Sequence, residues 1–367
     1  MAVYLINLCW VLIMSILAVM LSEVKYNQEL KIEKELPNAF FTALILLSLM
    51  SLYALRWRTG TDFGSYYHYY FTYGKMNFRD LIGTRDWGFY GLTSIIYKVW
   101  PDNFVFYNYI LSALTYIPVI HTFRKYSSNF AFTNILYITM MTYYWPFNGV
   151  RQSIACSICF CAYPLLYDKK YIKYVFCVLA AYLFHSTSLL MIPIMFIVTK
   201  KAWSKAVTVP LCTLILALIF LPNIWNHIIA FLKFIGQEKM ANDYSAFNYA
   251  DNGANILRVL VVLIPIIISF IFYKQLKQNN PKIDIFINMS LMCALFMVFA
   301  NKQTIFARIS DYFVFFNALL IPEFSTLFKE KSRILFKYAT NALFLIYMLM
   351  LLPIDSNLLP YQFIFNH

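Results

Sequence analysis

The stretch Arg56-Trp57-Arg58-Thr59-Gly60-Thr61-Asp62-Phe63 lies directly after an apolar run from Asn38 to Leu55. It places two guanidinium groups and a carboxylate at the edge of a membrane, in a chain that otherwise keeps charge out of its apolar segments. A guanidinium binds phosphate through a planar fork of donors, and a carboxylate beside it can accept a proton or hold a sugar hydroxyl. The stretch therefore suggests a site for a lipid phosphate and a sugar.

The composition around this stretch is that of a membrane protein. The 367 residues are 61% hydrophobic and only 13% charged, with a mean hydropathy of +0.62, whereas soluble domains are about 25% charged. Apolar runs recur from end to end, and a span needs roughly 20 such residues. Because backbone in lipid must satisfy its own hydrogen bonds, these runs are expected to be helices. We expect an all-α polytopic integral membrane protein that forms a single domain over residues 1–367.

The apolar runs predict eleven spans, and one doubtful segment, 88–101, would bring the number to twelve. The predicted spans are 3–22, 39–55, 103–121, 130–147, 150–167, 174–199, 205–222, 254–273, 284–300, 305–322 and 334–353. The first is interpreted as a retained anchor rather than a signal peptide. The net charge of +13 comes from Lys and Arg that cluster in short loops, which indicates cytoplasmic loops rather than nucleic-acid binding.

The loops at 169–173 and 200–205 are both basic, although one helix between them would put them on opposite sides of the membrane. An even number of passes resolves the conflict. Residues 174–199 are too few for two crossings, so we expect two half-helices that enter from the cytoplasm and meet at Phe184-His185-Ser186-Thr187-Ser188. The alternative is one long tilted helix with a basic loop on the unusual side.

Counting membrane crossings from the basic cytoplasmic loops in the same way places both ends of residues 58–102 on the external side. The segment 88–101 would then be interfacial or re-entrant rather than a crossing. Two external loops follow from this topology, 56–102 and 223–253. The second contains the polar and aromatic stretches Gln237-Glu238-Lys239 and Asn242-Asp243-Tyr244.

Ionisable side chains gather at the predicted external ends of the spans. They are Arg56, Arg58, Asp62, Arg151, Arg308 and Asp311, with His185 at the expected hinge. Charges at membrane edges are costly and usually mark function. Each also has a structural interpretation: Arg56 or Arg58 can extend to lipid headgroups, Arg151 can cap a turn, Arg308 and Asp311 can form a helix ion pair, and His185 can be a core residue. Tyr66, Tyr67, Tyr69, Tyr70 and Tyr73 could form an interfacial belt or stack on sugars.

Other kinds of chemistry lack support in the sequence. All seven cysteines fall within apolar runs, so we interpret them as small buried hydrophobes rather than zinc ligands or disulfides, although Cys156, Cys159 and Cys161 are closely spaced. Phosphate-binding loops, serine-hydrolase elbows, zinc-protease motifs and dinucleotide fingerprints are missing. The donor substrate is therefore expected to arrive in the membrane, and no cofactor or metal is expected.

Five short motifs occur in order along the chain. They are Arg58-Thr-Gly-Thr-Asp62-Phe63 with Tyr66, Tyr69 and Tyr70 downstream, Trp87-Gly88-Phe89-Tyr90, Arg151-Gln-Ser-Ile-Ala155, Phe184-His185-Ser-Thr-Ser188, and Arg308-Ile-Ser-Asp-Tyr312-Phe. Together they resemble the EpsG-like branch of the Wzy-type polysaccharide polymerases. That family usually shows Asp-Tyr where this chain has Asp62-Phe63, so a phenolic hydroxyl is lacking at this position.

The resemblance implies a GT-C-like membrane glycosyltransferase. Such an enzyme would join oligosaccharide repeat units carried on undecaprenyl pyrophosphate, building O-antigen, capsule or exopolysaccharide on the periplasmic or outer side of the bacterial inner membrane. Its expected partners are the lipid-linked donor and acceptor, membrane lipids and a chain-length regulator. A transporter that flips lipid-linked sugar, and a polysaccharide ligase or acyltransferase, are the alternatives.

The residues fit the roles that this reaction requires. A leaving pyrophosphate needs cations, which Arg151 and Arg308 would supply with help from Arg58. The attacking hydroxyl needs a base, and His185 and Asp62 are the two candidates. The residues expected to contact sugar are Tyr66, Tyr69, Tyr70, Asp311 and Tyr312.

Overall fold

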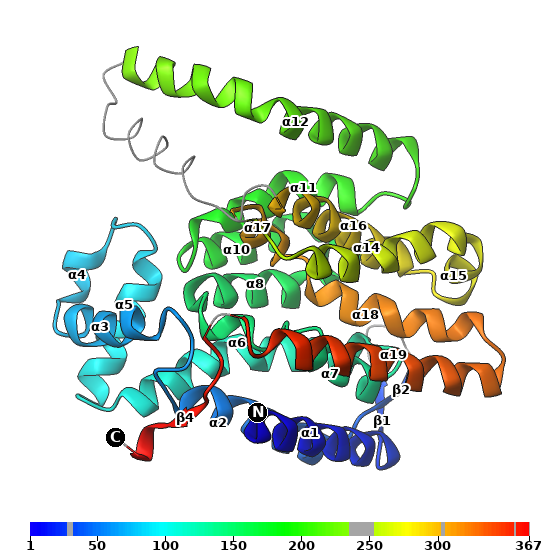
Figure 1. Ribbon diagram of the computed structural model, residues 1–367, viewed down its shortest axis with the longest axis horizontal. Helices are drawn as coiled ribbons and strands as arrows, with labels where there is room; N and C mark the ends of the chain where they lie inside the picture. The colour runs from blue at the N-terminus through cyan, green and yellow to red at the C-terminus, as the bar shows by residue number, and fades with distance from the viewer. Residues whose placement is uncertain (28–31, 235–252, 302–304, 356, 367) are drawn as a thin grey trace. The chain divides into compact units, whose positions relative to one another are not determined.

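The structure, a computed structural model, describes residues 1–27, 32–234, 253–301, 305–355 and 357–366, and almost all of its regular structure is helical (Figure 1). The chain divides into two compact units. One is formed by Met1–Ile192 together with Ala318–His367, and the other by Pro193–Asn317. The helical content and the long apolar helices confirm the expected all-α polytopic class.

The first unit contains the elements at both ends of the sequence. They are α1 (Ala2–Met20), β1 (Glu23–Asn27), β2 (Ile32–Leu36), α2 (Ala39–Ala54), β3 (Arg56–Trp57), α3 (Phe63–Gly74), α4 (Phe78–Leu81), α5 (Trp87–Val99), α6 (Phe104–Tyr126), α7 (Phe130–Thr139), η1 (Trp145–Phe147), α8 (Val150–Ala162), α9 (Pro164–Tyr167), α10 (Tyr171–Tyr182), η2 (Ser186–Leu190), η3 (Phe324–Leu327), α19 (Glu330–Leu351), β4 (Gln362–Phe363) and η4 (Ile364–Asn366).

The second unit contains the later elements, and two helices lie at the unit boundaries. Those of the unit are α12 (Lys205–Phe234), α14 (Ile256–Ile271), α15 (Tyr273–Asn279), α16 (Ile283–Ala300) and α17 (Ile305–Ser310). The boundary helices are α11 (Met191–Val198) and α18 (Phe315–Glu323).

The helices of the first unit pack around an aromatic core. α1 contacts α2 and α7, α2 contacts α6, α6 contacts α8, and α8 contacts α10. Tyr107, Tyr116 and Tyr143 are fully buried. Their hydroxyls are satisfied inside the core, since that of Tyr143 donates to the Leu49 carbonyl at 2.7 Å and that of Tyr116 to the Tyr143 carbonyl at 3.3 Å. Part of the high tyrosine content therefore stabilises helix packing.

The helix predicted over 174–199 is interrupted. α10 ends at Tyr182, His185 has an extended backbone (φ −157°, ψ 121°), and η2 begins at Ser186. This confirms the predicted break at 184–188 and excludes the single continuous helix. The side from which the two halves enter a membrane stays a prediction.

Some of the predicted spans form helices long enough to cross a membrane, and others form shorter helices. In the described part of the chain, α1, α6, α16 and α19 are long and apolar enough to cross a membrane. α14 and α15 together would form a fifth span that is bent by 83°. The predicted spans 39–55, 130–147 and 205–222 correspond to shorter apolar helical stretches. In the predicted span 130–147, α7 ends at Thr139 and the 3-10 turn η1, which contains Pro146, follows at Trp145–Phe147.

Residues 56–102 form a small helical region. α3 packs against α5, and α4 also contacts α5. α5 spans Trp87–Val99, so the predicted segment 88–101 is a helix of its own. With 13 residues it is shorter than the roughly 20 needed for a crossing.

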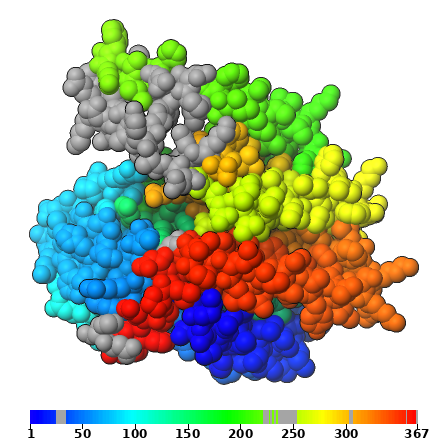
Figure 2. Space-filling view, in the orientation of Figure 1, coloured from blue at the N-terminus to red at the C-terminus, as the bar shows by residue number. Residues whose placement is uncertain are grey.

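The C-terminal segment is paired with the start of this region. β4 is antiparallel to β3, with Arg56 opposite Phe363 and Trp57 opposite Gln362. The Gly60 amide donates to the Asn357 carbonyl at 2.9 Å. Figure 2 shows this segment at the surface next to α1, where the Tyr4 hydroxyl donates to the Leu358 carbonyl at 2.6 Å.

The second unit is organised around α16. This helix is buried along most of its length and contacts α12, α14 and α17. Asp284 at its start accepts hydrogen bonds from the Ala202 amide at 3.0 Å and the Tyr273 hydroxyl at 2.8 Å. α12 continues to Phe234, so the first part of the predicted loop 223–253 is helical. Residues 235–252, with the two polar stretches noted above, lie outside the described residues.

Candidate functional site

Asp86, Arg151 and His185 come together in the first unit, and we call them the Asp86 cluster. Arg151 Nη1 donates to Asp86 Oδ2 at 2.9 Å, and the Ser186 amide donates to Asp86 Oδ1 at 3.2 Å. His185 Nδ1 lies 3.7 Å from Asp86 Oδ2, slightly beyond a direct hydrogen bond. The side chains of Asp86, His185 and Arg151 are 1%, 13% and 26% exposed, respectively. A buried carboxylate thus lies between a histidine and an arginine that are both partly exposed, the arginine more than the histidine.

The start of α5 is held against the interrupted helix. The Gly88 amide donates to the Leu183 carbonyl at 2.9 Å, which is available because α10 has ended. A Cβ at Gly88 would lie 2.5 Å from the Leu183 Cβ, so only glycine allows this approach. Asp86 itself has φ +58°, a region that aspartate tolerates better than most residues. The break at 183–185 and the turn before α5 therefore position each other.

Arg151 is placed by the first turn of α8, which begins at Val150. The turn before it, η1, brings Asn148 to the loop that precedes α3: its Oδ1 accepts from the Thr61 hydroxyl at 3.0 Å and from the Asp62 amide at 3.2 Å. The positive end of the α8 dipole adds to the guanidinium charge. This helix start is suited to an anionic ligand.

The carboxyl group of Asp86 is held in its charged form. Burial alone would raise its pKa, but the His185 ring and the Arg151 guanidinium outweigh burial and hold the pKa of Asp86 below its ordinary value. The carboxylate is consequently negative at neutral pH. It can orient the His185 ring and stabilise a positive charge on it.

Tyrosines form a wall beside Arg151. Tyr66, Tyr69 and Tyr73 share one face of α3, and the Tyr73 ring centroid lies 4.0 Å from that of Tyr90 of α5, with the two rings tilted by 35°. The Tyr90 hydroxyl accepts from Arg151 Nη1 at 3.0 Å. The Arg151 guanidinium carbon lies 5.9 Å and 5.7 Å from the Tyr69 and Tyr90 ring centroids. The predicted sugar-contacting residues Tyr66 and Tyr69 thus lie next to the cluster.

The Tyr66 and Tyr90 hydroxyls stay protonated at neutral pH. Burial raises the pKa of Tyr66 to about 12 and that of Tyr90 to about 12. The nearby Arg151 charge opposes this shift in both cases without cancelling it. These phenols can therefore exchange hydrogen bonds with sugar hydroxyls but are unsuited to act as bases.

Asp62 precedes α3 on the loop that contacts Asn148. Its backbone amide donates to Asn148 Oδ1 at 3.2 Å, and Asn148 lies three residues before Arg151. That Asp62 and His185 open to one cavity stays a prediction.

Tyr70 and Arg56 of the first unit are buried and make contacts that stabilise the fold. Tyr70 is fully buried, and its hydroxyl donates to the Trp100 carbonyl at 3.0 Å, so we do not retain it as a sugar contact. Arg56 is 1% exposed, and its guanidinium carbon lies 3.7 Å from the Tyr53 ring centroid. It donates to the Tyr53 carbonyl at 2.9 Å. Arg56 therefore stabilises the core and does not extend to lipid headgroups.

Arg308, Asp311 and Tyr312 lie in the second unit. Arg308 is exposed near the end of α17, and Tyr312 is buried after it. Their participation in a site with Arg151 stays a prediction.

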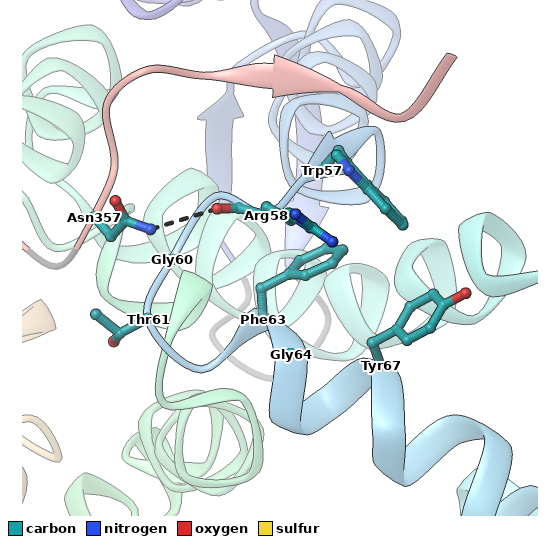
Figure 3. Close-up of a pocket in the computed structure, with 8 residues that line it drawn as sticks. All are labelled: Trp57, Arg58, Gly60, Thr61, Phe63, Gly64, Tyr67 and Asn357. Atoms are coloured by element: carbon teal, nitrogen blue, oxygen red, sulfur yellow. Dashed lines mark hydrogen bonds between the residues drawn. The ribbon is translucent and has the colours of Figure 1, made fainter. Parts of the chain in front are cut away.

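Arg58 lines a cavity of about 350 Å³, which we call the Trp57 pocket (Figure 3). Its walls are Trp57, Arg58, Gly60, Thr61, Phe63, Gly64, Tyr67 and Asn357. Neither Arg151 nor His185 is among them. Arg58 therefore lies in the Trp57 pocket, whereas Arg151 and His185 lie in the Asp86 cluster.

The cysteines are all free thiols. Cys156 and Cys159 are buried as expected, whereas Cys9, Cys161 and Cys212 are exposed on helix surfaces. Within the described ranges, no three His, Cys, Asp or Glu side chains are placed to hold a metal ion. Metal independence of the reaction stays a prediction.

Sequence reasoning overlooked Asp86, the residue at the centre of the cluster. The motif that begins at Trp87 was recognised, but the carboxylate directly before it was not. The signal was present, because Asp86 follows Arg85 in a segment expected at the membrane edge and precedes a glycine-containing aromatic helix. The same criterion that selected Asp62 would have selected it.

The comparisons with known proteins agree with the motifs. The family model that describes the EpsG family, which comprises EpsG-like polysaccharide polymerases, matches residues 39–363. No curated protein and no solved structure gave a significant match. The matched range includes the Asp86 cluster and the Trp57 pocket.

Proposed function

The chain belongs to the EpsG family, and on that premise we propose that it is a Wzy-type polymerase. It is a membrane glycosyltransferase that joins oligosaccharide repeat units carried on undecaprenyl pyrophosphate at the outer side of the cytoplasmic membrane. A hydroxyl of the acceptor attacks the anomeric carbon of the donor. The new glycosidic bond forms while the bond from that carbon to the pyrophosphate oxygen breaks, and the lipid pyrophosphate leaves with the electron pair.

His185 is the proposed base in this reaction. Asp86 faces its Nδ1 at 3.7 Å, which leaves Nε2 to take the proton of the attacking hydroxyl. The buried Asp86 carboxylate then stabilises the imidazolium that forms. A base oriented by a carboxylate contributes typically about 10²- to 10⁴-fold to rate. Asp62 remains the alternative base.

Arg151 is the proposed partner of the leaving pyrophosphate. Its Nη1 donates to Asp86 and to Tyr90, the side chain also bonds to Tyr66, and it is 26% exposed. Part of the guanidinium is thus open to a ligand while its position is fixed. Cations that stabilise the charge of a leaving group in a partly dry site give large rate effects. Arg308 is proposed as a second cation.

The observation that carries this proposal is that Arg151 and His185 both face the buried carboxylate of Asp86. An ion pair that served stability alone would not require a histidine beside it at a backbone break. Non-helical backbone at membrane depth is tolerated where it lines a cavity. Ionisable residues at such a place indicate function.

Elongation by the purified full-length protein tests the proposal. The protein in lipid nanodiscs receives undecaprenyl-pyrophosphate-linked repeat units from the source cells, and the products are separated by size. The wild type is expected to produce a ladder of longer chains, and His185→Gln to lower kcat about 10²-fold or more. His121→Gln, a change at an exposed histidine of α6, is the matched control. Near wild-type elongation by His185→Gln would transfer the base role to Asp62.

A lipid-linked oligosaccharide transporter is the second candidate, because interrupted helices are typical of transporters. The same nanodisc sample distinguishes the two, because a nanodisc separates no compartments and only a polymerase forms longer products in it. Transporters change only the side on which a substrate lies. If liposome-reconstituted protein moves the lipid-linked sugar across the bilayer and the nanodisc sample forms no longer products, the polymerase proposal is wrong.

A further inference from the structure

Helix α3 presents different residues on two faces. Tyr66, Tyr69 and Tyr73 recur at intervals of three and four residues and lie on the side of Arg151 and Tyr90. Phe63, Gly64 and Tyr67 lie on another face and line the Trp57 pocket. One short helix therefore separates two sites.

The pocket is built by unusual backbone and by the C-terminal segment. Arg58 has φ +47° and Gly60 has φ +97°, which turn the chain sharply between β3 and α3. A Cβ at Gly60 would lie 2.7 Å from the Phe147 carbonyl oxygen. Asn357 Nδ2 donates to the Arg58 carbonyl at 3.5 Å. The loop is thus fixed from both sides, which suits a preformed site.

Aromatic rings form one side of the pocket. Trp57 lies 5.7 Å from Tyr67 and 5.5 Å from Phe63 between ring centroids, in edge-to-face contacts. Figure 3 shows these rings on one side of the pocket, with Thr61 and Asn357 on the other. Aromatic faces bind the apolar faces of sugar rings, and a hydroxyl and an amide can bond sugar hydroxyls. The walls therefore have the chemistry of a carbohydrate site.

Arg58 gives the pocket its charge. Among the eight lining residues it is the one charged side chain, and it is exposed. Its guanidinium carbon lies 5.8 Å from the Trp57 ring centroid. In the described part of the chain this guanidinium makes neither a hydrogen bond nor an ion pair, in contrast to that of Arg151. A guanidinium held beside an aromatic ring in this way is available to an anion.

We propose that the Trp57 pocket is a second carbohydrate subsite, which binds a sugar ring that carries an anionic group. The sugar packs on the aromatic side while Arg58 binds the anion, which is either a phosphate or a carboxylate. The volume of about 350 Å³ falls in the range of roughly 300–1,000 Å³ of small-molecule sites. The inference rests on the proposed function, because a polymerase must hold two saccharide chains, one of which reacts at the Asp86 cluster.

Binding of simple sugars to the full-length protein in nanodiscs tests this subsite without turnover. The probes are glucose, glucose 1-phosphate and glucuronic acid, and the readout is the dissociation constant from saturation-transfer NMR titration. The wild type is expected to bind at least one anionic sugar about tenfold more tightly than glucose, because charge-assisted hydrogen bonds are the stronger ones. A preference for glucose 1-phosphate alone identifies a phosphate, and one for glucuronic acid alone identifies a carboxylate.

Arg58→Gln should abolish that preference while glucose binding stays the same. Arg79→Gln, at an exposed arginine of α4, is the matched control and should retain it. Equal binding of all three sugars by the wild type, or equal losses in the two variants, would overturn the proposal. These outcomes are independent of the elongation test at His185, so either proposal can fail alone.

Fluorescence supplies a second test if Arg58→Gln does not fold. Whichever anionic sugar the wild type prefers, glucose 1-phosphate or glucuronic acid, should change its tryptophan emission. Trp57→Phe should remove this change, and Trp100→Phe, at an exposed tryptophan, should leave it intact. A change that persists in Trp57→Phe would place the sugar elsewhere and overturn the subsite.

Discussion

Arg151 Nη1 lies 2.9 Å from Asp86 Oδ2 across 65 residues of sequence. The contact joins the first turn of α8 to the start of α5, with the carboxylate buried and the guanidinium partly open. Removing one member of such a pair leaves the other charge without its partner, which is costly. Single substitutions in this pair should therefore change both stability and activity.

Asp86→Asn keeps the shape of the side chain and removes its charge. Because the pKa of Asp86 is held below its ordinary value of 3.8, the carboxylate contributes stability above pH 3.8 and loses it as the pH falls through the lower folded-state pKa. The variant should melt at a lower temperature than the wild type, by the same amount at pH 7 and at pH 5. Asp80→Asn, at an exposed aspartate, is the control. A penalty that is already halved at pH 5 would contradict the assigned pKa direction.

Arg151→Lys and Arg308→Lys separate charge from shape. Lysine keeps the positive charge and loses the planar fork, so each variant should reduce elongation by about tenfold or more while membrane insertion stays normal. Elongation is measured in nanodiscs, and insertion by the yield of detergent-extracted protein. Arg79→Lys serves as the control. If both variants elongate at wild-type rates, the two arginines are anchors.

Gly60→Ala and Gly64→Ala should have opposite effects on stability. Gly60 has φ +97°, and an added Cβ would lie 2.7 Å from a backbone oxygen, so alanine there should cost about 2 kcal/mol or more. Among the described residues, no heavy atom lies within 4 Å of a Cβ at Gly64, which is helical. Alanine at Gly64 should be neutral or stabilising by about 0.5–1 kcal/mol. Thermal unfolding followed by fluorescence measures both, and equal destabilisation would contradict the backbone geometry.

The orientation in the membrane can be tested by cysteine labelling. In a cysteine-free version, Ser65→Cys, Asn248→Cys and Asn357→Cys should react with an impermeant thiol reagent in intact cells, because the basic loops are expected inside. Ser65 and Asn357 are exposed, and Asn248 lies outside the described residues. Ser127→Cys should not react.

Ser128→Cys is the necessary control for that negative result, because Ser127 is half-buried and Ser128 is exposed. It should react only after the cells are permeabilised. Labelling of Ser127→Cys and Ser128→Cys in intact cells, with protection of the other three, would invert the protein and exclude polymerisation on the outer side.

Local patterns predicted much of the fold. Apolar runs identified the helices, and the charge conflict around 174–199 identified the break at His185, because both signals lie within short stretches of sequence. The role of Tyr70 could not be foreseen in this way. It differs from Tyr69 by one position on α3, and only the packing of α3 on its neighbours decides which ring becomes buried.

Contacts between segments far apart in the sequence decide which residues meet in the candidate site. Arg151 and His185 were predicted one by one, but the residue that joins them, Asp86, is fixed by a close approach of Gly88 to Leu183. Helix periodicity contains no information about such an approach. The position of Arg308 stays a prediction because it belongs to the second unit.

The pairing of β3 with β4 has a consequence for biogenesis. The loop that carries Arg58 leaves the ribosome early, whereas the Gln362 amide that bonds to Thr59 Oγ1 follows 303 residues later. Residues 193–317, which form the second unit, must be translated in between. During this interval the nascent loop has no partner strand, and the Trp57 pocket is completed only after Asn357 has been translated.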